Sequence, residues 1–259
     1  MSMMAIGGRV IEVDSVDSTN KLAADLIAGT GSSHGTVILA HEQTAGRGQR
    51  GRDWLSAAGL DLTFSVTLQP VGLAARDQFH LARVAALAVR DAVISTLRTG
   101  QHIGPSEPAV AVKWPNDVLI DRRKVAGILI ECELAGGLVR HAIAGIGLNV
   151  NNLDLPEELM ATSLRLTAGG RSLDRMRLFQ VLLGHFEARY QQWCQAPTTL
   201  GQDYAEALWS RGRWCPMVLD GRSISLRPMD VDSQGRLLVE HDNGDVGAYG
   251  LDRLRFAPR

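Results

Sequence analysis

Apolar and polar residues alternate with a period of two along residues 61–69, DLTFSVTLQ. The apolar members are Leu62, Phe64, Val66 and Leu68, and hydroxyl or amide side chains stand between them. This period predicts a β-strand with one buried face. Shorter runs rich in β-branched residues predict further strands at residues 9–13 and 36–43.

A helical period, in which apolar residues recur every three or four positions, fits three longer segments. They cover residues 77–98, 173–195 and 199–209. A shorter helix is expected at residues 21–28, because DSTN at residues 17–20 supplies cap residues just before it. A polar turn with glycine and proline is expected at residues 99–108.

Three apolar segments then follow one another closely, which predicts antiparallel neighbours in one sheet. They are residues 109–121, 124–135 and 138–152. From Trp214 onward the chain changes to short strand-like pieces separated by DG, SQG and NG turn signals. That spacing predicts a small β-barrel of about 45 residues. The boundary before it is expected near residues 211–214.

Composition narrows the class of protein. The chain has 259 residues, 45% of them hydrophobic, and a formal net charge of -1, which does not favour a general nucleic-acid binder. Cys132, Cys194 and Cys215 show no zinc-site spacing and are expected to be reduced thiols. Neither a signal peptide nor an apolar run long enough to span a bilayer is visible. A cytoplasmic protein without a membrane partner is therefore expected.

The segment EQTAGRGQRGRDW, residues 42–54, interleaves glycine with arginine. Glycine lets the backbone approach a ligand closely, and the guanidinium group matches phosphate or carboxylate, so a loop that wraps an anion is predicted. A solvated basic loop is the alternative. The segment lacks the GK[ST] ending of a phosphate-binding P-loop. Its letters G-x-G-x-x-G fit a dinucleotide site, but no amphipathic helix follows them.

Three further stretches carry candidate chemistry. In VKWPND, Lys113 and Asp117 flank a turn that proline stiffens, and Asn116 favours the turn conformation. In KVAGILIE, Lys124 begins an apolar strand and offers a point charge for a phosphate or carboxylate. GIGLNVN places Asn149 after two glycines that permit close packing. A decorated strand end and a surface lysine remain the alternatives for the first two.

Taken together, these stretches resemble biotin–protein ligases. DSTN, EQTAGRGQRGRDW, VKWPND and KVAGILIE occur in the family's order, followed by GIGLNVN, and they span residues 17–151. The resemblance implies an α+β fold with a mixed-sheet catalytic domain of the biotin/lipoate ligase type at residues 1–211. Helices pack on that sheet, and a small Src-homology-3-like β-barrel follows at residues 212–259.

The resemblance also implies a two-step reaction. Biotin and Mg-ATP give biotinyl-5′-AMP and pyrophosphate, and biotin then passes to a lysine of a biotin carboxyl carrier domain. The implied small molecules are ATP, Mg²⁺ and biotin, and no protein side chains are expected to hold the metal. Some relatives carry an N-terminal DNA-binding domain, but DSTN begins at residue 17 here, so no nucleic-acid partner is expected. Sheet edges would allow a homodimer, and the sequence leaves the oligomeric state open.

The resemblance also implies roles for individual residues, which are assigned by their matching positions in the family's motifs. The biotin-binding set is Ser18, Thr19, Asn20, Gln43, Arg47, Gly48, Gln49, Lys124 and Gly127. The ATP and adenylate set is Arg50, Arg52, Trp54, Asn116 and Asn149. The implied catalytic set is Arg47, Lys113, Asp117 and Lys124, in which Asp117 would orient or deprotonate the acceptor lysine.

One position departs from the family pattern. Relatives commonly have arginine where this chain has Gln49, and that arginine is associated with holding the adenylate. Weaker retention of the intermediate is therefore expected. Two other functions stay open: a lipoate–protein ligase, which shares the fold and adenylation chemistry, and a biotin-responsive binding module without enzymatic activity.

Overall fold

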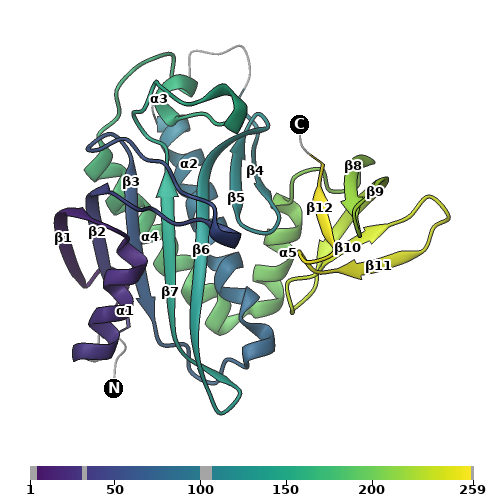
Figure 1. The fold of residues 1–259 in the computed structure, drawn as a ribbon, viewed down its shortest axis with the longest axis horizontal. Helices are drawn as coiled ribbons and strands as arrows, with labels where there is room; N and C mark the ends of the chain where they lie inside the picture. Colours follow the sequence, from purple (N-terminus) through teal and green to yellow (C-terminus); the bar gives the residue numbers. More distant parts are fainter. Residues whose placement is uncertain (1–4, 31–33, 100–106, 258–259) are drawn as a thin grey trace.

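The computed structural model describes residues 5–30, 34–99 and 107–257, so most of the polar turn expected at 99–108 lies outside the described residues. A seven-stranded sheet, ordered β1-β2-β3-β7-β6-β5-β4, forms its centre (Figure 1). Its strands are β1 (Arg9–Val16), β2 (Thr36–Gln43), β3 (Leu62–Leu68), β4 (Val110–Lys113), β5 (Asp117–Ile120), β6 (Arg123–Ala135) and β7 (Leu138–Leu148).

The sheet is mixed. Strand β1 runs parallel to β2, and every other neighbouring pair is antiparallel. The antiparallel arrangement predicted for the three apolar segments is confirmed, although the first of them folds into two strands, β4 and β5. Strand β1 extends beyond the predicted range to Val16. Strands β1 and β4 are the sheet edges, and a homodimer through such edges stays a prediction.

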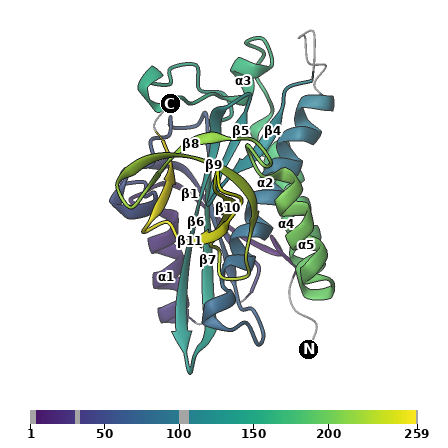
Figure 2. The same cartoon turned by 90° about the vertical axis from the view of Figure 1, so that its right-hand side faces the viewer.

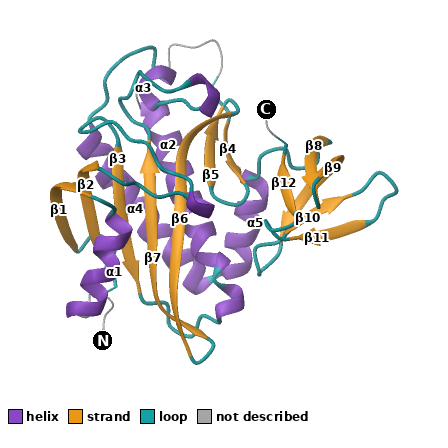
Figure 3. Cartoon of the chain, viewed as in Figure 1, coloured by secondary structure: helices purple, strands orange, loops and turns teal. Residues whose placement is uncertain are grey.

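Helices cover both faces of this sheet (Figures 1 and 3). Helix α1 lies on one face, and α2 and α4 lie behind the other. The helices are α1 (Thr19–Thr30), α2 (Phe79–Thr99), α3 (Leu164–Thr167), α4 (Arg175–Gln195) and α5 (Pro197–Ala207), with 3-10 turns η1 (Gln49–Gly51), η2 (Ala75–Asp77) and η3 (Glu157–Leu159). The predicted helices are confirmed with ends shifted by a few residues. Helix α4 starts after Asp174, whose carboxylate accepts a hydrogen bond from the Arg177 amide at 2.9 Å.

Strand β3 differs from its prediction of one buried face, because all seven of its residues are buried. On one side, Phe64 packs edge-on against Phe179 of α4 with ring centroids 5.3 Å apart. On the other side, the hydroxyl groups turn toward α1 and β2, and the Ser65 hydroxyl lies 2.7 Å from that of Thr19. The alternation therefore separates an apolar buried face from a polar buried face.

A second, five-stranded antiparallel sheet follows, ordered β11-β10-β9-β8-β12 (Figure 2). Its strands are β8 (Cys215–Leu219), β9 (Arg222–Val231), β10 (Leu237–Glu240), β11 (Val246–Tyr249) and β12 (Leu254–Phe256). Together the two sheets confirm the predicted α+β fold with a small C-terminal barrel. The division at residues 211 and 212 stays a prediction.

The turn between β9 and β10 fastens the barrel to the larger sheet. The buried Arg83 of α2 donates from Nη2 to the carbonyl oxygens of Val231 at 2.5 Å and Asp232 at 2.9 Å. Trp114, in the turn between β4 and β5, donates from Nε1 to the Gly235 carbonyl at 2.9 Å. These side-chain donors tie carbonyl groups of the turn to α2 and to the turn between β4 and β5.

Within the described part of the chain, no helix combines the length and the apolar character needed to cross a membrane.

We predict that Arg83→Leu lowers the free energy of unfolding by about 3 kcal/mol, because it removes both charge-assisted hydrogen bonds from Nη2 to the Val231 and Asp232 carbonyls. Urea denaturation at 25 °C measures the change. Arg98→Leu, on the exposed face of the same helix, is the control and should stay within about 0.5 kcal/mol of the parent protein. Equal losses for the two variants would contradict the role assigned to Arg83.

Candidate active site

The glycine- and arginine-rich loop, residues 44–61, folds back on itself as a short hairpin. The Gly48 amide donates to the Arg52 carbonyl at 2.6 Å, and the Trp54 amide donates to the Gly46 carbonyl at 3.0 Å. At the tip, Gly51 has a φ of 72°, which glycine adopts without strain. A side chain at Gly46 would lie 2.5 Å from the Trp54 carbonyl oxygen. The glycines thus make the hairpin geometrically feasible.

Asp61 anchors the far end of this loop. Its carboxylate accepts from the backbone amides of Ala57 and Val150, each at 2.9 Å. Burial raises the pKa of Asp61, and the amide hydrogen bonds oppose that shift. The loop is thereby tied to the segment that follows β7. Asp61 was not among the predicted site residues, since a lone aspartate before a strand carries no distinctive signal.

The loop crosses the α1 face of the sheet and lays Trp54 on its surface. Gly127 of β6 pairs with Gly147 of β7, and a Cβ at these positions would lie 2.9 Å and 2.1 Å from the indole ring. The indole Nε1 is buried and has no hydrogen-bond partner. An orphaned buried donor costs about 1–3 kcal/mol.

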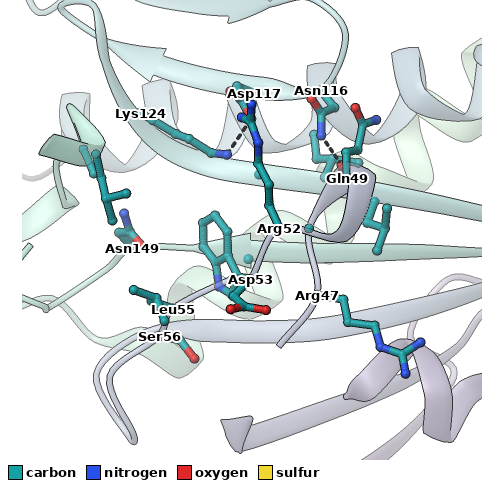
Figure 4. A pocket seen from close by; sticks show the side chains of 18 of the residues that line it. Arg47, Gln49, Arg52, Asp53, Leu55, Ser56, Asn116, Asp117, Lys124 and Asn149 are labelled. Atoms are coloured by element: carbon teal, nitrogen blue, oxygen red, sulfur yellow. Dashed lines mark hydrogen bonds and ion pairs between the residues drawn. The ribbon is translucent and has the colours of Figure 1, made fainter. Parts of the chain in front are cut away.

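Charged and amide groups gather beside the indole (Figure 4). Lys124 Nζ lies 2.7 Å from Asp117 Oδ1 and 5.3 Å from the centroid of the Trp54 ring. The Asn116 side chain donates to the Ile128 carbonyl at 2.7 Å, and the Ile128 amide donates back to the Asn116 carbonyl at 2.9 Å. The turn between β4 and β5 is therefore held against β6, with Asp117 facing Lys124.

Asn149, just after β7, presents a second orphaned atom. Its side chain is buried, and its Nδ2 donates to the Thr162 carbonyl at 3.0 Å. Its Oδ1 is buried without a partner. This end of the site thus offers one unpaired donor, on Trp54, and one unpaired acceptor, on Asn149.

A neutral polar cluster forms the opposite end, where α1 begins. Gln43 Oε1 accepts from the Thr19 amide at 2.8 Å and lies 3.0 Å from the Thr19 hydroxyl. The Ser65 hydroxyl lies 2.7 Å from the Thr19 hydroxyl and 2.6 Å from Asn20 Oδ1. DSTN therefore places hydroxyl and amide groups against the sheet. Ser65 was missed by the sequence prediction, although its polar position in an alternating strand was visible.

Both ends open into one cavity of about 1330 Å³. Every predicted site residue lines it: Ser18, Thr19, Asn20, Gln43, Arg47, Gly48, Gln49, Arg50, Arg52, Trp54, Lys113, Asn116, Asp117, Lys124, Gly127 and Asn149. The structure thus brings the predicted residues together, while their individual binding roles stay predictions. Arg47 lines the cavity, and its positive charge also acts on Asp17, just before the start of α1. The hydrogen bond from Lys21 is the main cause that lowers the pKa of Asp17, and Arg47 adds to it.

The C-terminal barrel also contributes to the cavity wall, which the sequence did not predict. Leu251, Arg255 and Phe256 line the cavity, and Lys113 Nζ lies 5.6 Å from the centroid of the Phe256 ring. Cationic side chains outnumber acidic ones in the lining. They are Arg47, Arg50, Arg52, Lys113, Lys124 and Arg255, against Asp53, Asp117, Asp154 and Glu158. The excess favours an anionic ligand.

Metal ligands do not gather in the residues that the structure describes: no group of three or more His, Cys, Asp or Glu side chains is placed to hold an ion.

A family model described as the biotin/lipoate A/B protein ligase family matches residues 12–149, more than half of the chain. The chain belongs to this family and is a ligase. The matched range contains the loop, the turn between β4 and β5, and the glycine pair of β6 and β7.

Individual relatives extend the similarity to most of the chain. The biotin–[acetyl-CoA-carboxylase] ligase of Mycobacterium tuberculosis is 37% identical over 235 residues, which cover 88% of this chain and 83% of that protein. The bifunctional ligase/repressor BirA of Bacillus subtilis is 33% identical over 95% of this chain and 74% of its own length. The structure of biotin protein ligase from Aquifex aeolicus in complex with biotin and ATP matches with a TM-score of 0.76 and 26% identity, covering 96% of this chain and 99% of that one.

Proposed function

We propose that this ligase activates biotin with ATP and transfers it to a lysine of a biotin carboxyl carrier domain. In the first step, the biotin carboxylate forms a bond to the α-phosphorus of ATP, and pyrophosphate leaves. In the second step, the lysine nitrogen forms an amide bond with the activated carboxyl carbon. AMP leaves, and the lysine gives up a proton.

The observation that carries this proposal is that one cavity joins two chemically different ends. The neutral end at Thr19 and Gln43 offers hydroxyl and amide oxygens to a group with N–H donors, as in the ureido ring of biotin. The other end offers cationic side chains and the unpaired atoms of Trp54 and Asn149. The cationic side chains suit a triphosphate, and the Trp54 indole suits an adenine ring.

The first step requires positive charge around the triphosphate and the attacking carboxylate. Lys124 is the residue we assign to the carboxylate and the adenylate phosphate, because its ammonium lies in the cavity beside the Trp54 indole. Arg50 and Arg52 on the loop supply further charge. Arg47, Gly48 and Gly127 would border the biotin tail, with Mg²⁺ bound to the phosphates. The indole of Trp54 also offers a stacking face for adenine.

The second step requires a group that accepts the proton of the lysine. Asp117 is our assignment, since its carboxylate lies in the cavity beside Lys124. Lys124 holds the orientation of this carboxylate through a contact of 2.7 Å. Lys113, the last residue of β4, adds positive charge beside Phe256 of the barrel.

Biotin fits better than lipoate, the other substrate class in the family description. The dithiolane ring of lipoate has no N–H donor, so it could not donate a hydrogen bond to the hydroxyl and amide oxygens around Thr19. A repressor role is not part of this proposal. The formal net charge of -1 gives the chain no overall attraction to DNA.

We predict that the protein releases pyrophosphate from ATP only when biotin is present, and that it then labels a biotin carboxyl carrier domain. Coupled pyrophosphate detection and labelled-biotin transfer measure the two steps. Lipoate in place of biotin is the control and should support neither step. Biotin binding without pyrophosphate release would replace the ligase by a binding module. Biotin-dependent binding to operator DNA in a gel shift would contradict the absence of a repressor role.

Gln49 lies at the loop tip, beside Asn116 in Figure 4. We predict that Gln49→Arg slows dissociation of biotinyl-AMP about tenfold, because a guanidinium adds a charge-assisted hydrogen bond to the adenylate phosphate. Stopped-flow or filter binding with preformed biotinyl-AMP measures the rate. Gln202→Arg, which adds the same charge on the exposed surface of α5, should leave it unchanged. If Gln49→Arg does not slow dissociation, the role given to this position is wrong.

We predict that Asp117→Asn slows transfer from preformed biotinyl-AMP about a hundredfold, because the neutral amide cannot accept the lysine proton. Single-turnover transfer to the carrier domain measures this step apart from adenylation. Asp121→Asn, at the end of the same strand, keeps an oxygen for the Ala109 amide and serves as the control. Transfer by Asp117→Asn at the parent rate would exclude Asp117 as the base.

A further inference from the structure

The neutral end of the cavity contains fewer hydrogens than its contacts require. Three close contacts join four oxygen atoms in a row: Asn20 Oδ1 to Ser65 Oγ at 2.6 Å, Ser65 Oγ to Thr19 Oγ1 at 2.7 Å, and Thr19 Oγ1 to Gln43 Oε1 at 3.0 Å. Only the two hydroxyl groups bring a hydrogen, because amide oxygens are pure acceptors. One of the three contacts is therefore left without a hydrogen bond.

The orientation of each amide is fixed by its other partners. Gln43 Oε1 also accepts from the Thr19 backbone amide at 2.8 Å, so an oxygen must stand there. Asn20 Nδ2 faces the Glu131 carboxylate at 2.6 Å and the Leu129 carbonyl at 3.5 Å, which are both acceptors. The nitrogen of Asn20 must point toward them, and its oxygen must point toward Ser65.

Glu131 is the stronger of the two partners that set this orientation. It stands on β6, two positions after Leu129, on the face that carries the cavity. Its side chain does not line the cavity, so it acts on a ligand only through Asn20. A carboxylate accepts hydrogen bonds and cannot donate one, so it would repel Asn20 Oδ1 if the amide turned over.

A reversed Asn20 amide would remove the deficit. Its Nδ2 would donate to Ser65, Ser65 would donate to Thr19, and Thr19 would donate to Gln43, so every contact would contain a hydrogen. The cluster would then be satisfied without any ligand. By preventing this, Glu131 keeps the cluster one donor short.

We infer that Glu131 is a specificity-determining positioning residue: by holding the Asn20 amide, it makes the cluster depend on an N–H donor from the ligand. The ureido ring of biotin supplies such donors. This inference rests on the proposed function, in which biotin binds at this end of the cavity. Glu131 thus influences which ligand binds, although its own side chain does not line the cavity.

The test uses Glu131→Gln in the full chain. A glutamine side chain can either accept from or donate to Asn20, so the amide is free to reverse. Calorimetry with biotin should show binding weakened about tenfold, while the KM for ATP stays unchanged. Preference for biotin over its analogue methylated at both ureido nitrogens should shrink by a similar factor. Glu133→Gln makes the same change two positions further along β6, where the partner is Arg140, and should match the parent.

A double variant separates positioning from simple structural support. Asn20→Asp alone places a carboxylate against that of Glu131 and should lose biotin binding. Asn20→Asp combined with Glu131→Gln exchanges donor and acceptor across the same contact and again presents an oxygen to Ser65. Biotin affinity should return to within about threefold of the parent.

The outcomes distinguish this inference from the proposed function. A parent protein that does not bind biotin refutes the function itself. If the parent binds biotin and Glu131→Gln keeps its affinity and its preference, the inference is wrong. It is also wrong if Glu131→Gln loses affinity for biotin and ATP together, or if the double variant shows no recovery, because either result indicates a general structural role.

Discussion

The absence of side chains at three glycines of β6 and β7 is the constraint on which the rest of the site depends. Gly127 and Gly147 leave room for the Trp54 indole, and Gly145 leaves room for the Asn20 amide. A Cβ at Gly147 would lie 2.1 Å from the indole, and one at Gly145 would lie 2.2 Å from the amide oxygen. Residues at both ends of the cavity therefore pack directly on the glycines of β6 and β7. Any side chain at these glycines would displace a site residue.

A second set of contacts holds the turn between β4 and β5 in place. The turn between β4 and β5 carries Asp117 into the cavity, and Tyr204 of α5 donates to its Pro115 carbonyl at 3.3 Å. Trp114 of the same turn donates to the barrel, which Arg83 also holds. The barrel, the helices α2 and α5, and the turn between β4 and β5 are thus connected by hydrogen bonds. The barrel is consequently part of the site's framework as well as part of its wall.

The sequence predicted the secondary structure of the described residues well and the relation between elements less well. For β3, the period of two located the strand correctly but gave only one buried face. A period reports which side chains are apolar; it does not report what covers the polar ones. Here α1 covers Ser65, whose hydroxyl contacts Thr19 and Asn20, so this polar residue is buried instead of solvated. Asp61 and Glu131 were missed for the same reason, because their partners are distant in the chain.

The sequence by itself determined the strands, the longer helices, and a loop whose glycines and arginines suit an anion. These features depend on local rules of backbone conformation and side-chain chemistry, which neighbouring residues carry. Only the tertiary structure decided how the loop is used. It laid Trp54 on the glycine pair, paired Lys124 with Asp117, and left the cluster at Ser65 one hydrogen short. Such features depend on atoms brought together from separate strands, and their geometry exists only once the sheet has formed.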